Sequence, residues 1–189
     1  ADYWKLFYRY PRLIGGGVWE WCDHISVQRD AAGNAIECYG GDSGDFPNDG
    51  NFCVDGLCYP DRTPHTGMKT MKYVMQPVEM KLLDETCGKL QLINRYDFCN
   101  LNTLVGHWSV RCGADVLCAG DLSVDLAAHQ TGTVTLGYTL PRRAPQAYDL
   151  TVEFVTAKPS AWSGAGYPLA HAQFCLPVKR TADAPVPAG

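Results

Sequence analysis

The chain contains the run Gly15-Gly16-Gly17-Val18-Trp19-Glu20-Trp21-Cys22, in which apolar residues follow three glycines. A short apolar run bounded by glycine predicts a buried strand. Side chains alternate along a strand, so Trp19 and Trp21 would share one face. Two roles are open for this pair. Both could be core aromatics, or Trp19, near the end of the strand, could offer a flat apolar plate to a ring such as a sugar.

Helices are predicted on either side of this strand. The segment 2–12 carries apolar and aromatic side chains three and four residues apart, and Pro11 ends the pattern. The segment 66–76 has the same period and is followed by Pro77. Between them, residues 30–61 contain seven acidic residues, no Lys or Arg, and frequent Gly and Pro. This composition predicts a long ordered loop.

The hydrophobic pattern of the sequence changes after Pro77. Short alternating runs, many with β-branched or aromatic residues, are spaced by turn formers, which is typical of a β-sandwich of the immunoglobulin type. The runs span residues 79–83, 89–96, 106–111, 133–138, 148–156 and 169–176. The tail is rich in Ala and Pro and is predicted to be a linker.

Composition excludes several classes of protein. The 189 residues are 46% hydrophobic and 19% charged, which suits one or two packed domains and argues against wholesale disorder. A formal net charge of −4 gives no general attraction to nucleic acid or to an anionic membrane. The longest run of apolar residues and glycines, 13–19, is far shorter than the roughly 18 residues of a spanning helix. No signal peptide is visible, because no basic segment precedes an apolar one.

Cysteine usage indicates the redox compartment. There are nine cysteines, and none of them forms a Cys-x-x-Cys pair, which disfavours a zinc ribbon or a redox dithiol. A chain of this length can build a core without disulfides. We therefore expect scattered free thiols and a cytoplasmic location.

The sequence also contains partial signals for a serine protease and for a calcium site. Gly41-Asp42-Ser43-Gly44 matches the core of the motif around the nucleophile of chymotrypsin-like proteases, but a two-barrel β fold is not expected here. Asp42, Asp45 and Asp49 could supply oxygens to Ca²⁺, although their spacing is not that of an EF-hand, and a solvated acidic loop is favoured. The five histidines form no pair at metal spacing.

Several blocks resemble one known family. The block 10–24 contains Tyr-Pro-Arg-Leu and then Gly-Gly-Gly-Val-Trp-Glu-Trp-Cys-Asp-His, and it resembles large bacterial β-galactosidases of glycoside hydrolase family two. The blocks 39–45, 47–49, 51–57 and 61–65 do so as well. The resemblance continues to residue 76, fades afterwards, and returns at 161–166.

The resemblance implies an α+β layout. Residues 1–76 would be the C-terminal strand and helix portion of a catalytic (β/α)₈ barrel. Residues 77–178 would be an all-β immunoglobulin-like sandwich, and 179–189 a linker. The implied reaction is retaining hydrolysis of terminal non-reducing β-D-galactose from β-galactosides such as lactose. Its two glutamates are expected upstream of Ala1, so no catalytic residue lies in this chain, Glu20 included, and the chain alone should be inactive. The full-length parent is expected to be a homo-oligomer that binds a β-galactoside sugar, but neither nucleic acid nor membrane.

The resemblance also assigns a wall of the site. Trp19 matches a tryptophan platform under the galactosyl ring, and Phe52 matches a residue whose backbone carbonyl binds Na⁺. Asp55 stands where the family has an Asn ligand, and it is expected to bind Na⁺ and the substrate. Asn48 matches a position near Mg²⁺, and Ser43 replaces an aromatic. Two alternatives stay open: another β-glycosidase of the same family, or a non-catalytic carbohydrate-binding sandwich that would use Trp108 and Trp162.

Overall fold

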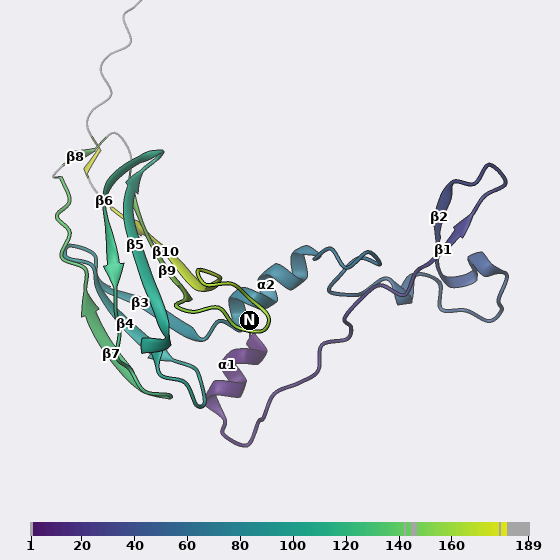
Figure 1. Ribbon diagram of the computed structural model, residues 1–189, viewed down its shortest axis with the longest axis horizontal. Coiled ribbons are helices and arrows are strands. Elements are labelled where there is room, and N and C mark those ends of the chain that lie inside the picture. The colour runs from purple at the N-terminus through teal and green to yellow at the C-terminus, as the bar shows by residue number, and fades with distance from the viewer. Residues whose placement is uncertain (1, 142, 145–146, 178, 181–189) are drawn as a thin grey trace, which may run out of the picture. The chain divides into compact units, whose positions relative to one another are not determined.

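The computed structural model describes residues 2–141, 143–144, 147–177 and 179–180. The chain divides into two compact units, Ala1–Met75 and Gln76–Gly189, and each is described by itself. Strands are the main regular elements, and the helices are few and short (Figure 1). Within the described ranges, no helix is both long and apolar enough to cross a membrane.

The two helices predicted for the first unit are present, although both are shorter than expected. Helix α1 spans Asp2–Arg9, and its last turn is followed by Tyr10 and Pro11. The residue before a proline is disfavoured in the helical region, so the helix ends before that point. Helix α2 spans Thr66–Val74.

The strand predicted around Trp19 and Trp21 is not formed. Trp19 is 78% exposed and Trp21 is 65% exposed, so neither is a core residue. A strand requires hydrogen-bonded pairing along its length, and in this stretch the pairing amounts to one isolated parallel bridge between Cys22 and Cys58. The prediction of a buried strand was therefore wrong for this chain, because pattern alone does not supply pairing partners.

The acidic region is more regular than the predicted loop. Strands β1 (Ser26–Arg29) and β2 (Ala35–Cys38) form an antiparallel hairpin. Asp30 shapes its turn, because the carboxylate oxygen Oδ1 accepts hydrogen bonds from the backbone N–H groups of Ala32 at 2.9 Å and Asn34 at 2.8 Å. Two short 3₁₀ helices follow, η1 (Gly40–Ser43) and η2 (Gly50–Cys53).

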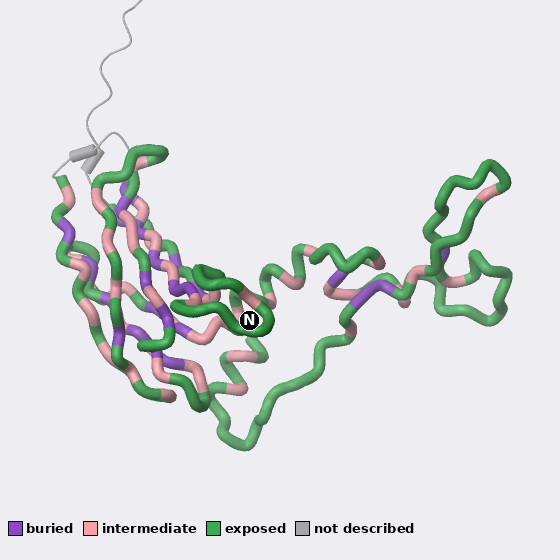
Figure 2. The backbone as a smooth tube through the Cα atoms, in the orientation of Figure 1, coloured by how far each residue is buried: buried purple, intermediate pink, exposed green. Residues whose placement is uncertain are grey.

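Very little of the first unit is buried. Among its described residues, only Cys22, Asp23, Cys38 and Cys58 are buried (Figure 2). Burial of apolar area is the main favourable term in folding. The first unit therefore draws little stability from a core of its own and relies largely on hydrogen bonds.

The second unit contains two main antiparallel sheets. Their strand orders are β3-β4-β7 and β10-β9-β5-β6. The strands are β3 (Val78–Asp84), β4 (Lys89–Asn94), β5 (Leu104–Cys112), β6 (Asp115–Leu122), β7 (Thr131–Thr135), β9 (Tyr148–Thr156) and β10 (Pro168–Leu176). A short 3₁₀ helix, η3 (Leu101–Thr103), precedes β5.

All six predicted alternating runs are strands, and β6 was missed. The predicted linker, 179–189, lies outside the described residues apart from Lys179 and Arg180. These two form β11 (Lys179–Arg180), which pairs in parallel with β8 (Arg143–Ala144).

One core joins the two sheets. Leu150, Val152 and Phe154 alternate along β9 and are fully buried, and they belong to the same cluster as Leu90 and Leu92 of β4. Burying a side chain of this size contributes about 1.5–3 kcal/mol. The alternation explains why these strands were visible in the sequence.

The buried polar side chain of this core is fully satisfied. The Nδ2 of Asn94 donates to the carbonyl oxygens of Cys99 at 2.8 Å and Leu126 at 2.9 Å, and its Oδ1 accepts from the N–H of Tyr96 at 2.9 Å. A buried amide with these partners avoids the cost of an unmade hydrogen bond, and it fixes the loop that follows β4.

Candidate functional site

The segment that follows Trp19 is hydrogen-bonded through its backbone to a distant loop, residues 53–58. The carbonyl oxygen of Glu20 accepts from the N–H of Leu57 at 2.8 Å, and that of Trp21 accepts from the N–H of Cys58 at 3.0 Å. The N–H of His24 donates to the carbonyl oxygen of Cys53 at 2.8 Å. Residues 20–24 and 53–58 therefore form one locally ordered module within the first unit.

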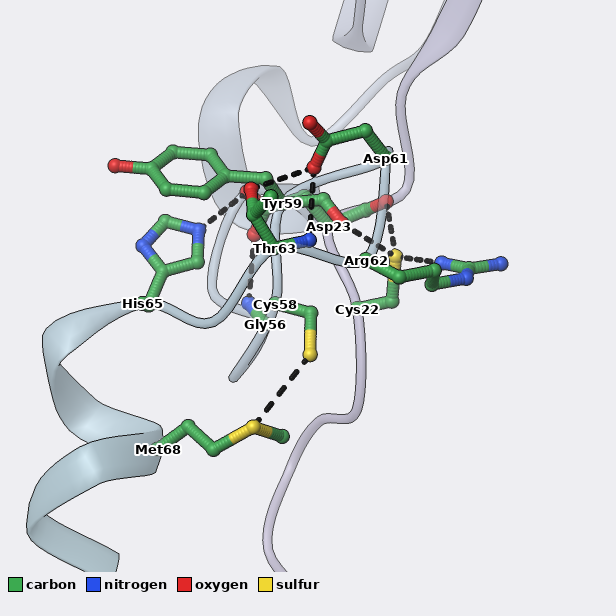
Figure 3. Close-up of polar contacts among 10 residues, drawn as sticks. All are labelled: Cys22, Asp23, Gly56, Cys58, Tyr59, Asp61, Arg62, Thr63, His65 and Met68. Atoms are coloured by element: carbon green, nitrogen blue, oxygen red, sulfur yellow. Dashed lines mark hydrogen bonds and ion pairs between the residues drawn. The ribbon is translucent and has the colours of Figure 1, made fainter.

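Asp23 lies at the centre of this module (Figure 3). Its side chain is only 1% exposed. Oδ1 accepts from the N–H of Gly56 at 2.8 Å, and Oδ2 lies 2.9 Å from Nε2 of His65. A carboxylate is stable in a buried position only when its oxygens have partners, and both oxygens have one here.

His65 connects the module to helix α2. It is the residue that precedes the first turn, and its N–H donates to the carbonyl oxygen of Leu57 at 2.9 Å. Its ring stacks on that of Tyr59, with 3.7 Å between the ring centroids and 24° between the planes. The imidazole is thus held on one face by an aromatic ring and at Nε2 by Asp23.

Gly56 is required by the closeness of the two segments. A Cβ atom at this position would overlap the backbone nitrogen of Asp23 and lie 2.7 Å from the Cα of Cys22. Backbone atoms cannot give way as the end of a flexible side chain can. Any side chain at residue 56 would therefore push the loop away from residues 22–23.

The turn Tyr59–Thr63 closes the module on the side of Cys22. Asp61 Oδ1 accepts from the N–H of Thr63 at 2.8 Å and from its hydroxyl at 2.6 Å, and these bonds lower the pKa of the Asp61 carboxyl. Arg62 adopts φ = 72° and donates from Nη1 to the Sγ of Cys22. The Cys22 thiol also lies 3.4 Å from the carbonyl oxygen of Tyr59.

A cavity of about 680 Å³ borders this cluster. Its lining combines polar and apolar residues and includes Glu20 and His24, whose Oε2 and Nε2 atoms lie 2.8 Å apart. The lining residues are Glu20, Trp21, Cys22, Asp23, His24, Ile25, Ser26, Cys38, Tyr39, Gly40, Ser43, Pro60 and Arg62. None of the four predicted site residues lines it.

Those four residues lie on the two bonded segments and on the loop between them. Trp19 is directly before Glu20, Phe52 lies in η2, and Asp55 is directly before Gly56. All three are exposed. Asn48 is exposed as well, but its amide is used within its own loop: Nδ2 donates to the carbonyl oxygen of Asp45 at 2.9 Å, and Oδ1 accepts from the N–H of Gly50 at 3.1 Å.

The sodium and magnesium roles of these groups stay predictions. The carboxylate of Asp55 and the backbone carbonyl of Phe52 are oxygen donors of the kind that hard cations take. Asn48 keeps one lone pair on Oδ1, so a magnesium role for it stays a prediction. In the part of the chain that the structure describes, no three His, Cys, Asp or Glu side chains are grouped to hold a metal ion.

The serine-protease and calcium alternatives gain no support from the described residues. Ser43 accepts from Nε2 of Gln28 at 2.9 Å, whereas a protease nucleophile needs a histidine. Asp42 Oδ2 accepts from the N–H of Tyr39 at 2.9 Å and so caps η1. Trp108 packs against the core of the second unit, while Trp162 is 66% exposed and meets the ring of Tyr167 edge-on at 5.5 Å.

Asp23 and His65 were missed by the sequence analysis as functional residues. Both fall inside blocks that carry the family resemblance, which is the only signal that could have drawn attention to them. They are 42 positions apart, and no local pattern couples two residues at that separation.

Comparison with known proteins agrees with the two-unit division. Residues 1–80 match the family model described as the TIM barrel domain of glycosyl hydrolases family 2. Residues 90–177 match the model described as domain 4 of β-galactosidase.

Curated relatives named β-galactosidase match almost the whole chain. The one from Pectobacterium atrosepticum is 39% identical over 180 residues, which is 94% of this chain and 17% of the relative. The relatives from Klebsiella pneumoniae and Priestia megaterium are 38% and 36% identical, with the same two coverages. This chain thus spans about a sixth of the length of the relatives it matches. The chain belongs to glycosyl hydrolase family 2, and it joins part of the family's TIM barrel domain to a β-galactosidase domain 4.

Proposed function

We propose that this chain is part of a β-galactosidase that hydrolyses terminal non-reducing β-D-galactose from β-galactosides, lactose among them, with retention of configuration. The observation that carries the proposal is the 35–39% identity to proteins named β-galactosidase along nearly the entire chain. The similarity includes both units, and it covers the blocks around Trp19 and Asp55.

In this proposal the chain contributes a wall of the site and not the reacting carboxylates. Retaining glycosidases use two carboxyl groups about 5–5.5 Å apart, one as nucleophile and one as acid/base. Glu20 is paired with His24 and is assigned neither role. Both carboxylates would come from the rest of the parent protein, so the chain by itself should not catalyse the reaction.

Trp19 would hold the galactosyl ring. Its indole is exposed and lies at the start of the bonded segment, so one face can pack against the apolar C–H groups of a sugar. Asp55 and the carbonyl of Phe52 would bind Na⁺, and a cation there would supply positive charge that orients sugar hydroxyls. Asn48 would lie near Mg²⁺.

The second unit is proposed to be an immunoglobulin-like sandwich. Seven strands divide into sheets of orders β3-β4-β7 and β10-β9-β5-β6, and the connections β4–β5, β6–β7 and β7–β9 pass from one sheet to the other, as in Greek-key sandwiches. In the parent we further propose a cytoplasmic homo-oligomer, a location that suits nine cysteines without a disulfide among them.

The proposal is tested by assaying the full-length parent with chromogenic β-galactosides and β-glucosides, and by following the anomer formed first by NMR. We expect hydrolysis of the galactoside, a β-anomer as first product, and no turnover by residues 1–189 alone. Preference for the glucoside would favour another β-glycosidase, and an inactive parent that binds saccharides would favour the carbohydrate-binding alternative. Turnover by the purified chain that Glu20→Gln abolishes would contradict the structural role given to Glu20.

A further inference from the structure

We propose that Asp23 and His65 act as a positioning pair, which fixes the backbone of Asp55 and thereby the galactoside-binding wall. This inference rests on the proposed function. Neither residue is assigned contact with the sugar, and neither is offered as a catalytic group. Their role would be exerted through the loop 53–58, which they hold against the segment that follows Trp19.

The hydrogen bond from Gly56 to Asp23 lies directly beside Asp55. The N–H of Gly56 belongs to the peptide unit that directly follows Asp55. Its 2.8 Å bond to Oδ1 of Asp23 therefore sets the orientation of that peptide and the direction in which the Asp55 side chain leaves the backbone. Because Gly56 has no Cβ, the two segments approach closely enough for this bond to form.

His65 in turn fixes the carboxylate of Asp23. A carboxylate with one bonded oxygen can still rotate about its terminal torsion. The 2.9 Å contact between Oδ2 and Nε2 of His65 removes that freedom. The imidazole in turn is held by the ring of Tyr59 and by the N–H bond of His65 to Leu57. Each member of the chain of contacts is thus immobilised by the next.

Few side-chain contacts hold the part of the loop around Asp55 in place. Phe52 is 79% exposed, and Val54 and Asp55 are exposed as well. Asp23, in contrast, is almost completely buried. A loop whose side chains at these positions are exposed takes its local geometry largely from its hydrogen bonds, and small displacements of a binding group can cost up to about 100-fold in rate.

The experiment uses the full-length parent and variants that separate geometry from charge. Asp23→Ala removes both hydrogen bonds. Asp23→Asn keeps an oxygen for Gly56 and an amide for His65 but removes the charge. His65→Phe keeps a ring on Tyr59 and loses the bond to Asp23. The matched control is Asp121→Ala, which removes another His–Asp pair, where Nδ1 of His107 lies 2.8 Å from Oδ1 of Asp121.

The readouts are KM and kcat for a chromogenic β-galactoside, and the Kd of a non-hydrolysable thiogalactoside measured by calorimetry, all well below the Tm of each variant. We expect Asp23→Ala and His65→Phe to raise KM and Kd by about 10–100-fold, the range seen when groups that orient a binding residue are removed. Changes in kcat should be smaller. Asp23→Asn should stay within about threefold of the parent, and Asp121→Ala should not differ from it, because geometry and not charge is what the pair supplies.

A merely structural pair would lower Tm but leave KM and Kd of the folded protein unchanged, and that result would overturn the inference. Equal losses in Asp23→Asn and Asp23→Ala would overturn it too, since charge would then be the cause. If Asp23→Ala does not fold, the comparison of KM and Kd between His65→Phe and Asp23→Asn tests the inference instead.

Trp19→Ala distinguishes failure of the positioning role from failure of the proposed function. If it weakens thiogalactoside binding while the Asp23 and His65 variants do not, only the positioning role has failed. If the parent neither binds nor hydrolyses galactosides, the proposed function has failed.

Discussion

Gly88 lies against the ring of Tyr138, so closely that a Cβ atom on Gly88 would be 2.5 Å from Cε1 of the ring. The two residues belong to adjoining backbone segments: the carbonyl oxygen of Gly88 accepts from the N–H of Leu136 at 3.2 Å, and that of Cys87 accepts from Gly137 at 3.0 Å. Gly88 also adopts φ = 66°, a region that favours glycine. Two separate requirements therefore exclude a side chain at this position.

Gly88→Ala should lower the free energy of unfolding, and a matched glycine isolates the steric part. Gly137 has φ = 74° but nothing within 4 Å of its would-be Cβ. Gly137→Ala should therefore cost about 1–2 kcal/mol for the backbone conformation alone. Gly88→Ala should cost about 1–3 kcal/mol more, because the ring of a packed residue must move. Urea denaturation of both variants measures the difference, and equal losses would show that the ring yields freely.

Tyr138 should be the last tyrosine to ionise. Burial, reinforced by the nearby groups Cys87 and Asp84, raises the pKa of Tyr138 to about 12, and its hydroxyl donates to the carbonyl oxygen of Glu85 at 2.9 Å. A raised pKa favours the protonated form in the folded state. Its contribution to stability is therefore complete below the unfolded value of about 10 and is lost as the pH rises through about 12.

Absorbance titration of tyrosinate measures this. We expect a late step near pH 12 that is missing in Tyr138→Phe. Tyr96, whose pKa is also raised by burial, should give a late step that persists in that variant. A titration in which Tyr138→Phe removes an ordinary early step would contradict the buried environment.

The cysteines should react in groups that follow their exposure. Cys99 and Cys175 are exposed, whereas Cys22, Cys38 and Cys58 are buried. Reaction requires access to the thiolate, so the native chain should show two fast thiols, slower intermediate ones, and three that react only on opening. The denatured chain should titrate close to nine. A denatured count near one would instead indicate four disulfides and overturn the cytoplasmic assignment.

How far the sequence predicts this fold depends on where the pairing partners lie. Strand β9 was predicted over the residues it occupies, because its alternating side chains are buried against a sheet inside the same unit. Strand β7 ends at Thr135, earlier than predicted, because Gly137 turns the backbone there. Strand β6 was missed because it is an edge strand whose central residues include Ala119 and Gly120. The run around Trp19 has the apolar pattern of a strand, but it is paired through only one isolated bridge, Cys22 to Cys58, and so does not form a strand.

The residues of the candidate site also differ in whether the sequence alone could reveal them. Trp19, Phe52 and Asp55 could be named from family resemblance alone, since they fall in continuous blocks of sequence. The Asp23–His65 contact could not, because two segments must fold against each other before it exists. Long-range contacts between polar side chains have no periodicity, and only the three-dimensional arrangement reveals them.

Trp19→Ala in the full-length parent should lower kcat/KM for a β-galactoside. The loss of transition-state stabilisation calculated from kcat/KM should be about 2–4 kcal/mol, the range of one well-placed interaction that orients the substrate. Because Trp19 is exposed, Tm should change little. Trp162→Ala is the matched control, since Trp162 is an exposed tryptophan on the second unit. Unchanged kcat/KM in Trp19→Ala would contradict the platform role, and loss of saccharide binding in Trp162→Ala would favour the carbohydrate-binding alternative.

The second unit should fold by itself, whereas the first should not. Residues 76–180 contain the core cluster around Phe154, and nearly every strand of the two sheets buries one face in it. About a hundred residues with such a core should be stable by roughly 5–15 kcal/mol. Residues 1–75 have four buried side chains in their described part and depend on hydrogen bonds such as that between Asp23 and Gly56.

Separate expression of the two segments tests this, with unfolding followed by circular dichroism and amide protection by hydrogen exchange. Residues 76–180 should unfold cooperatively, and the amides of β5 and β9 should be the slowest to exchange because those strands are central in their sheet. Phe154→Ala, which deletes a fully buried ring, should cost about 3–5 kcal/mol. Residues 1–75 should show exchange close to that of an unfolded chain, since few of their side chains are removed from water. Cooperative unfolding of residues 1–75 alone would contradict this, and it would mean that the hydrogen-bonded module around Asp23 is stable without a larger apolar core.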